Sequence, residues 1–339
     1  MTISTYWYFD EFGPAKTVLK QGRQTLPPLL PGQALVAIRA IGLNRADYQY
    51  VLGKHFPPRA LPACVSQEAC GVIVELGPEP TDPKSRRHWR IGDRVAFAPM
   101  RVDMGGMGVL RDRGVYDQSS LLAIPDGFSD RQAAAYWMGI LTMAGAMEMA
   151  GIGPKNSRGQ SIVVTAATGG VATMGLRLAQ AWGAETVAIT RSQEKAEWLA
   201  ALADHVVVAD SASSFRARLR SLFPNGVDVV IDPLGGEYVG ASVEALSFDG
   251  HYVGYEMVTR SSGTFDIPSL LQAGAHLHGY TVFRLLQQPG LMDRMLEIGM
   301  KYAPQAKPIL AENYGFDAAP DAYAALNRCQ HFGKITIAL

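Results

Sequence analysis

The sequence predicts an α/β protein in which a doubly wound parallel-sheet domain is inserted into a β-rich domain built from both chain ends. Three observations predict this fold. Up to about residue 125 the chain forms short strand-like runs separated by Gly and Pro, then strand and helix patterns alternate, and the last residues again resemble a strand. Alternating strands and helices imply crossover connections and a parallel sheet. We expect residues 1–127 and 285–339 to form the β-rich domain and residues 128–284 the doubly wound domain.

In the β-rich part, runs of β-branched and apolar residues bounded by turn residues predict strands at Ala34–Asn44, Cys70–Gly77 and Asp93–Pro99. The polar, proline-containing segment Gly77–Asp93 is predicted to be a surface loop. The segment Arg101–Gly114 has closely spaced glycines and little periodicity, which predicts a mobile loop or an active-site lid.

In the doubly wound part, Ser129 is a predicted N-cap that opens a run of strong helix formers, and Ser213–Phe223 has a helical pattern. The predicted strands are Ser161–Thr165, Thr186–Thr190, His205–Val208, Val227–Asp232, Gly250–Gly254 and Leu277–Val282. The chain then closes with a predicted strand in Phe332–Leu339. No internal repeat or low-complexity tract interrupts this order.

Composition excludes several classes of function. Hydrophobic residues make up 48% and charged residues 18% of the 339 residues, and 31 basic side chains balance 31 acidic ones. A balanced charge predicts no broad attraction to nucleic acid or to an anionic membrane. No stretch approaches the roughly 20 apolar residues of a spanning helix, and the first residues lack the pattern of a secretory signal. Because Cys64, Cys70 and Cys329 cannot all pair, we expect reduced thiols in a cytoplasmic protein.

A glycine turn follows the strand Ser161–Thr165 and opens an amphipathic helix. A full G-x-G-x-x-G pattern would place glycines at 167, 169 and 172, whereas the chain has Ala167, Gly169 and Ala172. Gly169 lets the backbone approach a pyrophosphate, and the helix N-terminus can receive it. The expected phosphate-binding residues are Thr168, Gly169, Gly170 and Val171. The alternative is an α/β domain that has lost its nucleotide.

The end of the second strand indicates which nucleotide binds. NAD-selective domains place an acidic residue there, but this chain has Thr190, Arg191 and Ser192, with Lys195 one turn further on. Cations at a helix start oppose the helix dipole unless an anion is bound, and a 2′-phosphate supplies that anion. These residues therefore predict NADP(H), with a solvated basic helix start as the alternative.

Six segments of the chain, in this order and spacing, resemble the medium-chain dehydrogenase/reductase superfamily, and most of all its zinc-independent quinone oxidoreductase and enoyl reductase branch. The segments are Gly42–Gly53, Ser66–Gly77, Gly92–Phe97, Gly114–Gly127, Thr165–Gly175 and Phe332–Ile337. The resemblance spans nearly the whole chain. It implies a GroES-like catalytic domain and a Rossmann-type NADP(H)-binding domain.

The same resemblance predicts that no metal is bound. Zinc alcohol dehydrogenases carry a cysteine where this chain has Asn44, and Gly-His-Glu where it has Ser66-Gln67-Glu68. Amides bind zinc poorly compared with thiolate and imidazole. His276 and His278 lie on one face of a predicted strand, but no third ligand is close to them in the sequence.

The resemblance implies that Asn44 and Asp47 lie on the substrate side of the nicotinamide, where Asn44 could donate to a carbonyl and Asp47 orient its neighbours. Some enoyl reductases have a proton-donating tyrosine where this chain has His55, which could be a general acid or a surface residue. Quinone reductases often have tyrosine at Gln49 and arginine at Val51, so the proton donor is open.

On the cofactor side, the resemblance implies that Thr142 approaches the nicotinamide, that Gly254 and Tyr255 lie near its carboxamide, and that Arg328 reaches the phosphates. It also implies an interdomain pocket for a small hydrophobic substrate. The pocket would be lined by Asn44, Asp47, Tyr48–His55, Arg101–Gly114 and Phe283. Relatives commonly dimerise through the last strand of the nucleotide domain, here Leu277–Val282, so we expect a homodimer.

The predicted function is zinc-independent, NADPH-dependent transfer of hydride to a conjugated carbonyl compound, either a quinone or an α,β-unsaturated carbonyl. One alternative is an enoyl reductase for thioester or carrier-bound intermediates, for which Arg86, Arg87 and Arg90 could form a basic patch or simply a solvated loop. Another alternative is a non-catalytic protein that binds NADPH.

Overall fold

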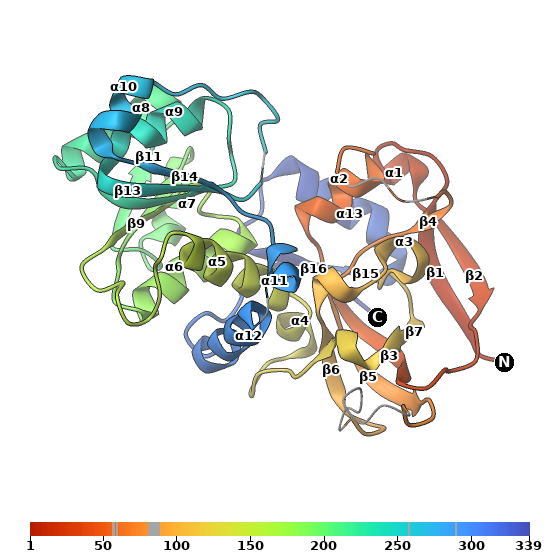
Figure 1. Ribbon diagram of the computed structural model, residues 1–339. Helices are drawn as coiled ribbons and strands as arrows, with labels where there is room; N and C mark the ends of the chain where they lie inside the picture. The colour runs from red at the N-terminus through yellow and green to blue at the C-terminus, as the bar shows by residue number, and fades with distance from the viewer. Residues whose placement is uncertain (56–57, 59, 81–88, 257, 289) are drawn as a thin grey trace. The chain divides into compact units, whose positions relative to one another are not determined.

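The computed structural model describes residues 1–55, 58, 60–80, 89–256, 258–288 and 290–339. The chain folds into two compact units (Figure 1). Residues Met1–Met138 and Pro308–Leu339 form the first, and Gly139–Lys307 form the second. The predicted α/β class is confirmed, since a parallel-sheet unit made from an interior segment is inserted into a β-rich unit made from both chain ends.

The first unit is built on a sheet of order β15-β16-β3-β5-β6-β8, with β7 paired along β3, and on a smaller antiparallel sheet of order β2-β1-β4. Its strands are β1 (Ile3–Phe9), β2 (Lys20–Thr25), β3 (Gln33–Gly42), β4 (Ala63–Cys64), β5 (Ala69–Leu76), β6 (Arg94–Phe97), β7 (Arg113–Asp117), β8 (Leu121–Leu122), β15 (Leu310–Gly315) and β16 (Lys334–Ala338). Its helices are α1 (Ala15–Val18), α2 (Arg45–Val51), α3 (Met104–Met107), α4 (Asp130–Ala133) and α13 (Ala319–Arg328).

The core of the first unit lies between these sheets and α13. Ile41, Ile73, Phe97 and Ile337 come from different strands and are fully buried together with Tyr323 of α13. The C-terminal strand β16 pairs antiparallel with β3 and parallel with β15. This pairing brings the last residues of the chain beside the end of β3, where α2 begins.

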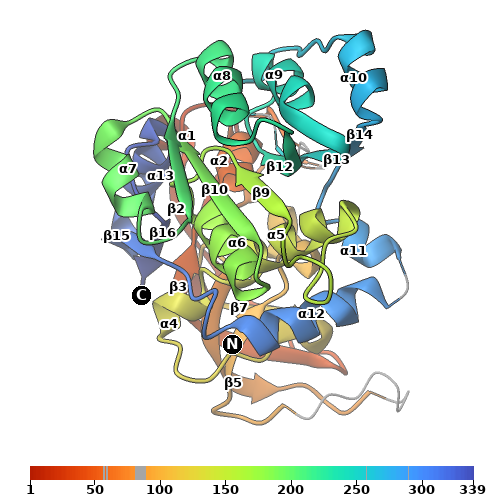
Figure 2. The same ribbon diagram turned by 90° about the vertical axis from the view of Figure 1, so that its left-hand side faces the viewer.

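The second unit has one parallel sheet of order β11-β10-β9-β12-β13-β14. Its strands are β9 (Ser161–Val164), β10 (Glu185–Thr190), β11 (His205–Val208), β12 (Val227–Asp232), β13 (Leu246–Gly254) and β14 (His276–Gly279). Its helices are α5 (Trp137–Met149), which starts two residues before the unit, α6 (Gly170–Ala181), α7 (Gln193–Leu199), α8 (Ala212–Leu222), α9 (Glu237–Ala245), α10 (Ile267–Ala273), α11 (Arg284–Gln287) and α12 (Leu291–Tyr302). Helices α5 and α6 lie on one side of the sheet and α8, α9 and α10 on the other (Figures 1 and 2).

Two glycines allow α5 to pack closely against α6. A Cβ atom on Gly175 would lie 2.6 Å from Sδ of Met143, and one on Gly139 would lie 1.8 Å from Cε of Met174. Neither position has room for a larger residue without movement of the facing methionine. This packing fixes α6, and with it the turn after β9.

Two expectations need correction. The predicted loop Arg101–Gly114 contains helix α3, because Asp103 caps it by accepting a hydrogen bond from the Gly106 N–H at 3.2 Å. The strand expected at Leu277–Val282 is β14, which ends at Gly279. It ends there because Tyr280 turns into the core, where its hydroxyl donates to the Leu141 carbonyl at 3.1 Å.

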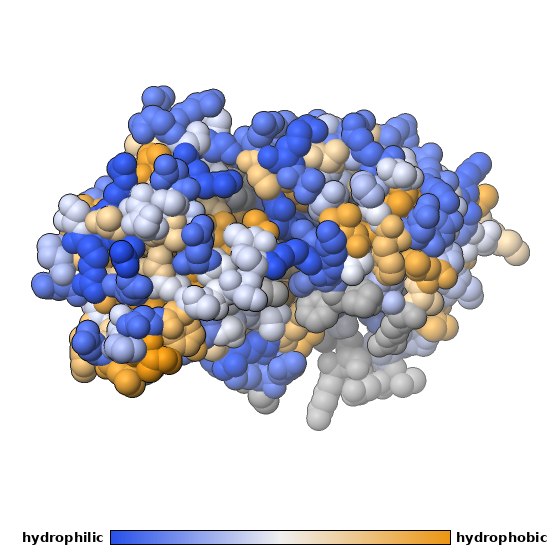
Figure 3. All heavy atoms as spheres, turned by 90° about the horizontal axis from the view of Figure 1, so that it is seen from above, coloured by the Kyte–Doolittle hydropathy of each residue, from blue (hydrophilic) through white to orange (hydrophobic). Residues whose placement is uncertain are grey.

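The surface seen in Figure 3 is mostly hydrophilic, with apolar side chains in separate patches. Among the described residues, no helix combines the length and the apolar character needed to cross a membrane.

Candidate functional site

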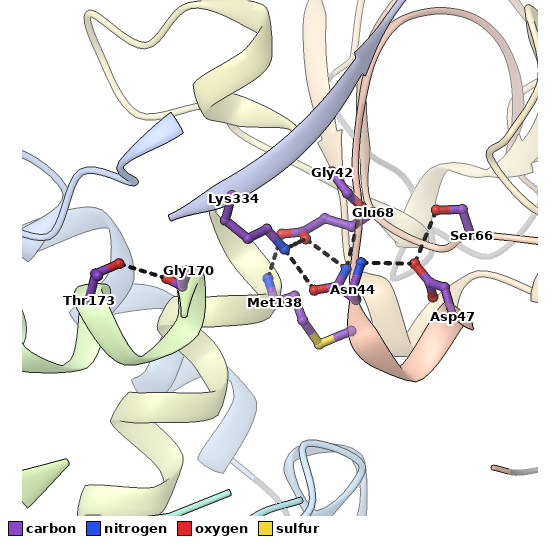
Figure 4. A network of polar contacts seen from close by, with 9 residues as sticks. All are labelled: Gly42, Asn44, Asp47, Ser66, Glu68, Met138, Gly170, Thr173 and Lys334. Carbon is purple, nitrogen blue, oxygen red and sulfur yellow. Dashed lines mark hydrogen bonds and ion pairs between the residues drawn. The ribbon is translucent and has the colours of Figure 1, made fainter. Parts of the chain in front are cut away.

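A buried polar network lies where β3, β16 and the segment before β5 meet in the first unit (Figure 4). The Lys334 ammonium donates to Oδ1 of Asn44 at 2.7 Å and to Oε2 of Glu68 at 2.9 Å. Nδ2 of Asn44 also donates to Oε2 of Glu68, at 2.9 Å. The side chains of Lys334 and Glu68 are only 4% and 1% exposed. The three groups thus form a closed triangle of charge-assisted hydrogen bonds.

Local structure fixes each member of this triangle. Asn44 is the N-cap of α2, two residues after the end of β3, and Glu68 directly precedes β5. The backbone N–H of Met138 donates to the other oxygen of Glu68, Oε1, at 2.7 Å. Gly333 has a φ of +92°, and a Cβ there would lie 2.4 Å from the Ile309 carbonyl oxygen. Only glycine fits that turn, and it places Lys334 at the start of β16.

Asp47 extends the network. Its Oδ2 accepts from the Asn44 backbone N–H at 3.3 Å and from the Ser66 hydroxyl at 3.2 Å. Oδ1 is buried and has no hydrogen-bond partner among the described residues. Burial raises the pKa of Asp47 to about 7, an effect that the positive charge of Lys334 opposes. This carboxyl group therefore changes protonation near neutral pH.

Ser66 stands where the zinc enzymes have glycine, and its φ of +71° lies in the left-handed region that glycine favours. Its hydrogen bond to Asp47 helps to hold this conformation. The donors around it do not fit zinc. Asn44 offers an amide oxygen that is already bound to an ammonium group, and Gln67 offers a second amide. Among the described residues, no group of three or more His, Cys, Asp or Glu side chains could hold a metal ion.

In the second unit, β9 and β12 are neighbours at the point where the strand order reverses, which is where open α/β sheets bind ligands. Asp232 ends β12 and is fully buried. It accepts hydrogen bonds from the Thr165 hydroxyl, from Leu234 N at 3.0 Å, from Gly235 N at 2.8 Å and from the Tyr252 hydroxyl at 2.9 Å. These four donors fix the two turns that follow β9 and β12.

The turn after β9 leads into the N-terminus of α6. Its left-handed residue is Ala166, with a φ of +47°, and not Ala167, where the full glycine pattern would place its first glycine. Gly169 is the N-cap of α6. Among the described residues, the only atom within 4 Å of a Cβ on Gly169 would be the Ala166 carbonyl oxygen, at 3.4 Å, so the backbone is open there. This arrangement fits a pyrophosphate.

The four residues predicted to bind a 2′-phosphate follow one another at the end of β10. Thr190 is buried and accepts from the Ser192 N–H at 3.2 Å. Ser192 caps α7 by accepting from the Lys195 N–H at 3.3 Å, which leaves its own hydroxyl proton available. Arg191 is exposed and Lys195 half-buried. Arg191 also lies near Tyr238 of α9, whose pKa is raised by burial and lowered in part by that charge.

The remaining predicted residues lie in both units. Thr142 is buried on α5, Gly254 ends β13, and Tyr255 follows it. His55 lies half-buried in the turn after α2, and Arg328 is exposed at the end of α13. In the predicted basic patch, Arg90 is exposed, whereas Arg86 and Arg87 lie outside the described residues.

Glu68, Lys334 and Asp232 belong to the site but were not predicted from the sequence. A signal existed for each. Lys334 is a charged residue at the start of an otherwise apolar strand, and Asp232 is an acidic residue at the carboxyl end of a buried one. Glu68 is the acidic residue that this chain shares with the Gly-His-Glu segment of the zinc enzymes.

Two family models match the chain. The alcohol dehydrogenase GroES-like domain matches residues 30–134, and the zinc-binding dehydrogenase domain matches residues 170–297. The chain is 32% identical over 321 residues to a phenolphthiocerol synthesis polyketide synthase of Mycobacterium bovis. The matched region is 92% of this chain and 14% of that protein. It is 31% identical to erythronolide synthase of Saccharopolyspora erythraea, over 91% of this chain and 8% of that protein. The chain therefore spans a small part of these curated relatives.

Solved structures have the same fold. The quinone oxidoreductase of Thermus thermophilus, solved alone and with NADPH, superposes with a TM-score of 0.80 at 23% identity, over 99% of this chain and 100% of that one. The CurK enoyl reductase superposes with a TM-score of 0.83 at 21% identity, over 99% of both chains.

Proposed function

We propose that this chain, which belongs to the medium-chain dehydrogenase/reductase superfamily, is an NADPH-dependent reductase of conjugated carbonyl compounds. The observation that carries the proposal is the Asn44 amide. It stands where the zinc enzymes of the family have a cysteine, and Lys334 and Glu68 hold it in place. A site with an amide and an ammonium group in place of a metal suits acceptors that conjugation has already activated.

NADP(H) is the proposed cofactor. The open backbone at Gly169 and the N-terminus of α6 suit its pyrophosphate, and Arg191, Ser192 and Lys195 suit its 2′-phosphate. The structure of the Thermus thermophilus quinone oxidoreductase with NADPH supports the assignment, because that protein has the same fold. Bound NADPH would supply the hydride.

The residues of the first unit are proposed to act on the acceptor. Asn44 donates an N–H to the carbonyl oxygen, on which negative charge develops. Asp47 orients the Asn44 backbone through its hydrogen bond and is positioned to hold a proton near neutral pH. His55 remains our candidate for the proton donor.

The acceptor is either a quinone or an α,β-unsaturated carbonyl compound. A second candidate function, reduction of an enoyl thioester, is favoured by the similarity of almost the whole chain to parts of polyketide synthases. The CurK enoyl reductase also has this fold.

We further propose a homodimer. Strand β14 is an edge of the sheet in the second unit, and Leu277 on it is 36% exposed. On the neighbouring β13 and α10, Phe248 and Leu271 are 82% and 73% exposed. An unpaired edge beside exposed apolar side chains is a surface that pairing with a second copy would cover.

NADPH oxidation with a benzoquinone, an alkenal, a cyclic enone and an enoyl thioester tests the proposal, with NADH as the cofactor control. We expect turnover that prefers NADPH, and we expect Asn44→Ala to reduce kcat about 100-fold. The best acceptor decides between the two candidate functions. Tight NADPH binding without any acceptor-dependent oxidation would favour a non-catalytic protein.

A further inference from the structure

Lys334 has more hydrogen-bond donors than its surroundings accept. An ammonium group carries three N–H donors. Two of the Lys334 donors bind Asn44 and Glu68, and the described residues supply no acceptor for the third. The side chain is only 4% exposed, so water does not readily replace the missing partner. The third donor is the first sign that an oxygen atom from outside the chain completes this site.

The orientation of the Asn44 amide points in the same direction. Because the ammonium group can only donate, the Asn44 atom that faces Lys334 must be the oxygen, and this fixes which end of the amide carries the N–H groups. One of these N–H groups donates to Glu68 at 2.9 Å, while the other acceptor that the described residues offer to Nδ2, the Gly42 carbonyl, is 3.5 Å away. At that distance the hydrogen bond is weak. Asn44 therefore keeps an N–H that can bind a stronger acceptor.

Glu68 cannot take up either spare donor easily. It already accepts from Lys334 and Asn44 on Oε2 and from the Met138 N–H on Oε1. Its side chain is 1% exposed. Within the Lys334, Asn44 and Glu68 triangle every side-chain oxygen already accepts a hydrogen bond, whereas Lys334 and Asn44 each keep a donor, which is the pattern expected beside a binding position for an oxyanion.

We propose that Lys334 is a positioning residue for the reductase reaction, and that it does two things. It holds the Asn44 amide with its N–H toward the acceptor oxygen, and it places a fixed positive charge beside that oxygen. This inference rests on the proposed function. Lys334 would supply, without a metal, part of the electrostatic stabilisation that a Lewis acid gives in the zinc enzymes.

Lys334 keeps its proton throughout the proposed reduction of an α,β-unsaturated carbonyl compound. A hydride, which bound NADPH would supply on its oxidation to NADP⁺, adds to the β-carbon of the acceptor, and the π electrons of the C=C bond form a new double bond between the α-carbon and the carbonyl carbon. The carbonyl π electrons move to oxygen, which becomes the enolate oxyanion. A proton from the donor group, for which His55 is our candidate, then adds to the α-carbon, and the C=O bond reforms. The positive charge of Lys334 lowers the energy of the enolate.

Variants at two positions test the inference. Lys334→Met alone would leave Glu68 buried without a counter-charge and could unfold the protein. The main test is therefore the double variant Lys334→Met/Glu68→Gln, in which both buried charges are removed together. Lys334→Arg keeps the charge. Lys20→Met is the matched control, because it also removes an ammonium group paired with a carboxylate in the first unit, but at an exposed position.

The first readout is steady-state kinetics. We expect the double variant to lose about 100-fold in kcat, with the KM for NADPH nearly unchanged. Lys334→Arg should recover at least part of that loss, and Lys20→Met should behave as wild type. A folded double variant with the kcat of wild type would overturn the inference.

The second readout needs no NADPH and no turnover. The phenolate oxygen of p-nitrophenol carries charge as an enolate oxygen does, and its absorbance reports ionisation. Wild type should bind the phenolate form in preference to the phenol, and the double variant should lose this preference. Absence of the preference in wild type would overturn the role of Lys334. Wild type could show the preference for phenolate and yet fail to oxidise NADPH with every acceptor of the panel. In that case the proposed function fails, while the charge of Lys334 at an oxyanion position stands.

Discussion

Replacing Asp47 by Asn should change how the stability of the protein depends on pH. Asp47 is fully buried, and the described residues donate hydrogen bonds to only one of its carboxylate oxygens. Its pKa is raised from 3.8 to about 7, chiefly by burial. A pKa difference of one corresponds to about 1.4 kcal/mol, so ionising this group in the folded protein costs up to roughly 4 kcal/mol.

The sign follows from proton binding. Between pH 4 and pH 7 the folded protein keeps the Asp47 proton while the unfolded chain has lost it, so the contribution of Asp47 to the unfolding free energy falls as the pH rises. Asparagine stays neutral and can still accept the hydrogen bond from Asn44. We therefore expect Asp47→Asn to stabilise the protein relative to wild type by roughly 1.5 kcal/mol at pH 5 and by roughly 4 kcal/mol at pH 8.

Urea unfolding of both proteins at several pH values measures this difference. Asp10→Asn serves as a control of opposite sign, because the pKa of exposed Asp10 is lowered by its hydrogen bond to Lys20. Equal effects of Asp47→Asn at pH 5 and pH 8 would refute the reasoning, since they would mean that Asp47 does not titrate between those values.

Three further predictions concern the second unit. Tyr252→Phe removes one of the donors to buried Asp232 and should lower the unfolding free energy by about 1.5–3 kcal/mol in urea titrations, whereas Asp232→Asn, which turns an acceptor into a donor, should cost more. Arg191→Ala should weaken NADPH binding about 10-fold and leave NADH binding unchanged in calorimetric titrations, while the control Lys155→Ala should change neither. The pKa of His278 is lowered by burial and by His276, so the unfolded chain takes up the proton first as the pH falls. Thermal unfolding of His278→Asn should accordingly show a smaller loss of stability below about pH 6 than wild type.

The parallel sheet could be predicted closely because local pattern and tertiary environment agree there. Strands β11 and β12 have the predicted bounds, since valine and isoleucine, which favour strands, make up most of both. The phosphate-binding turn was also predictable, because a strand, a glycine pair and an amphipathic helix occur together in the sequence.

Long-range contacts set the limits of prediction. Lys334 is 290 residues from Asn44 in the sequence, and only the pairing of β16 with β3 brings the two together. No local pattern reports that pairing. Helix α3 is short, and its two glycines have a low helix propensity, so the local sequence does not predict it. Its formation depends on the Asp103 cap and on packing against β4.

The most direct test of the proposed function is hydride transfer from NADPH deuterated at the transferring position of the nicotinamide, followed in single-turnover experiments with the best acceptor. We expect a slower transfer with the deuterated cofactor and, when the acceptor is an enone or an enoyl thioester, deuterium at the β-carbon of the product by NMR. A product that forms without the label, or at the same rate with both cofactors, would contradict hydride transfer from NADPH to a conjugated acceptor as the rate-setting chemistry of this protein.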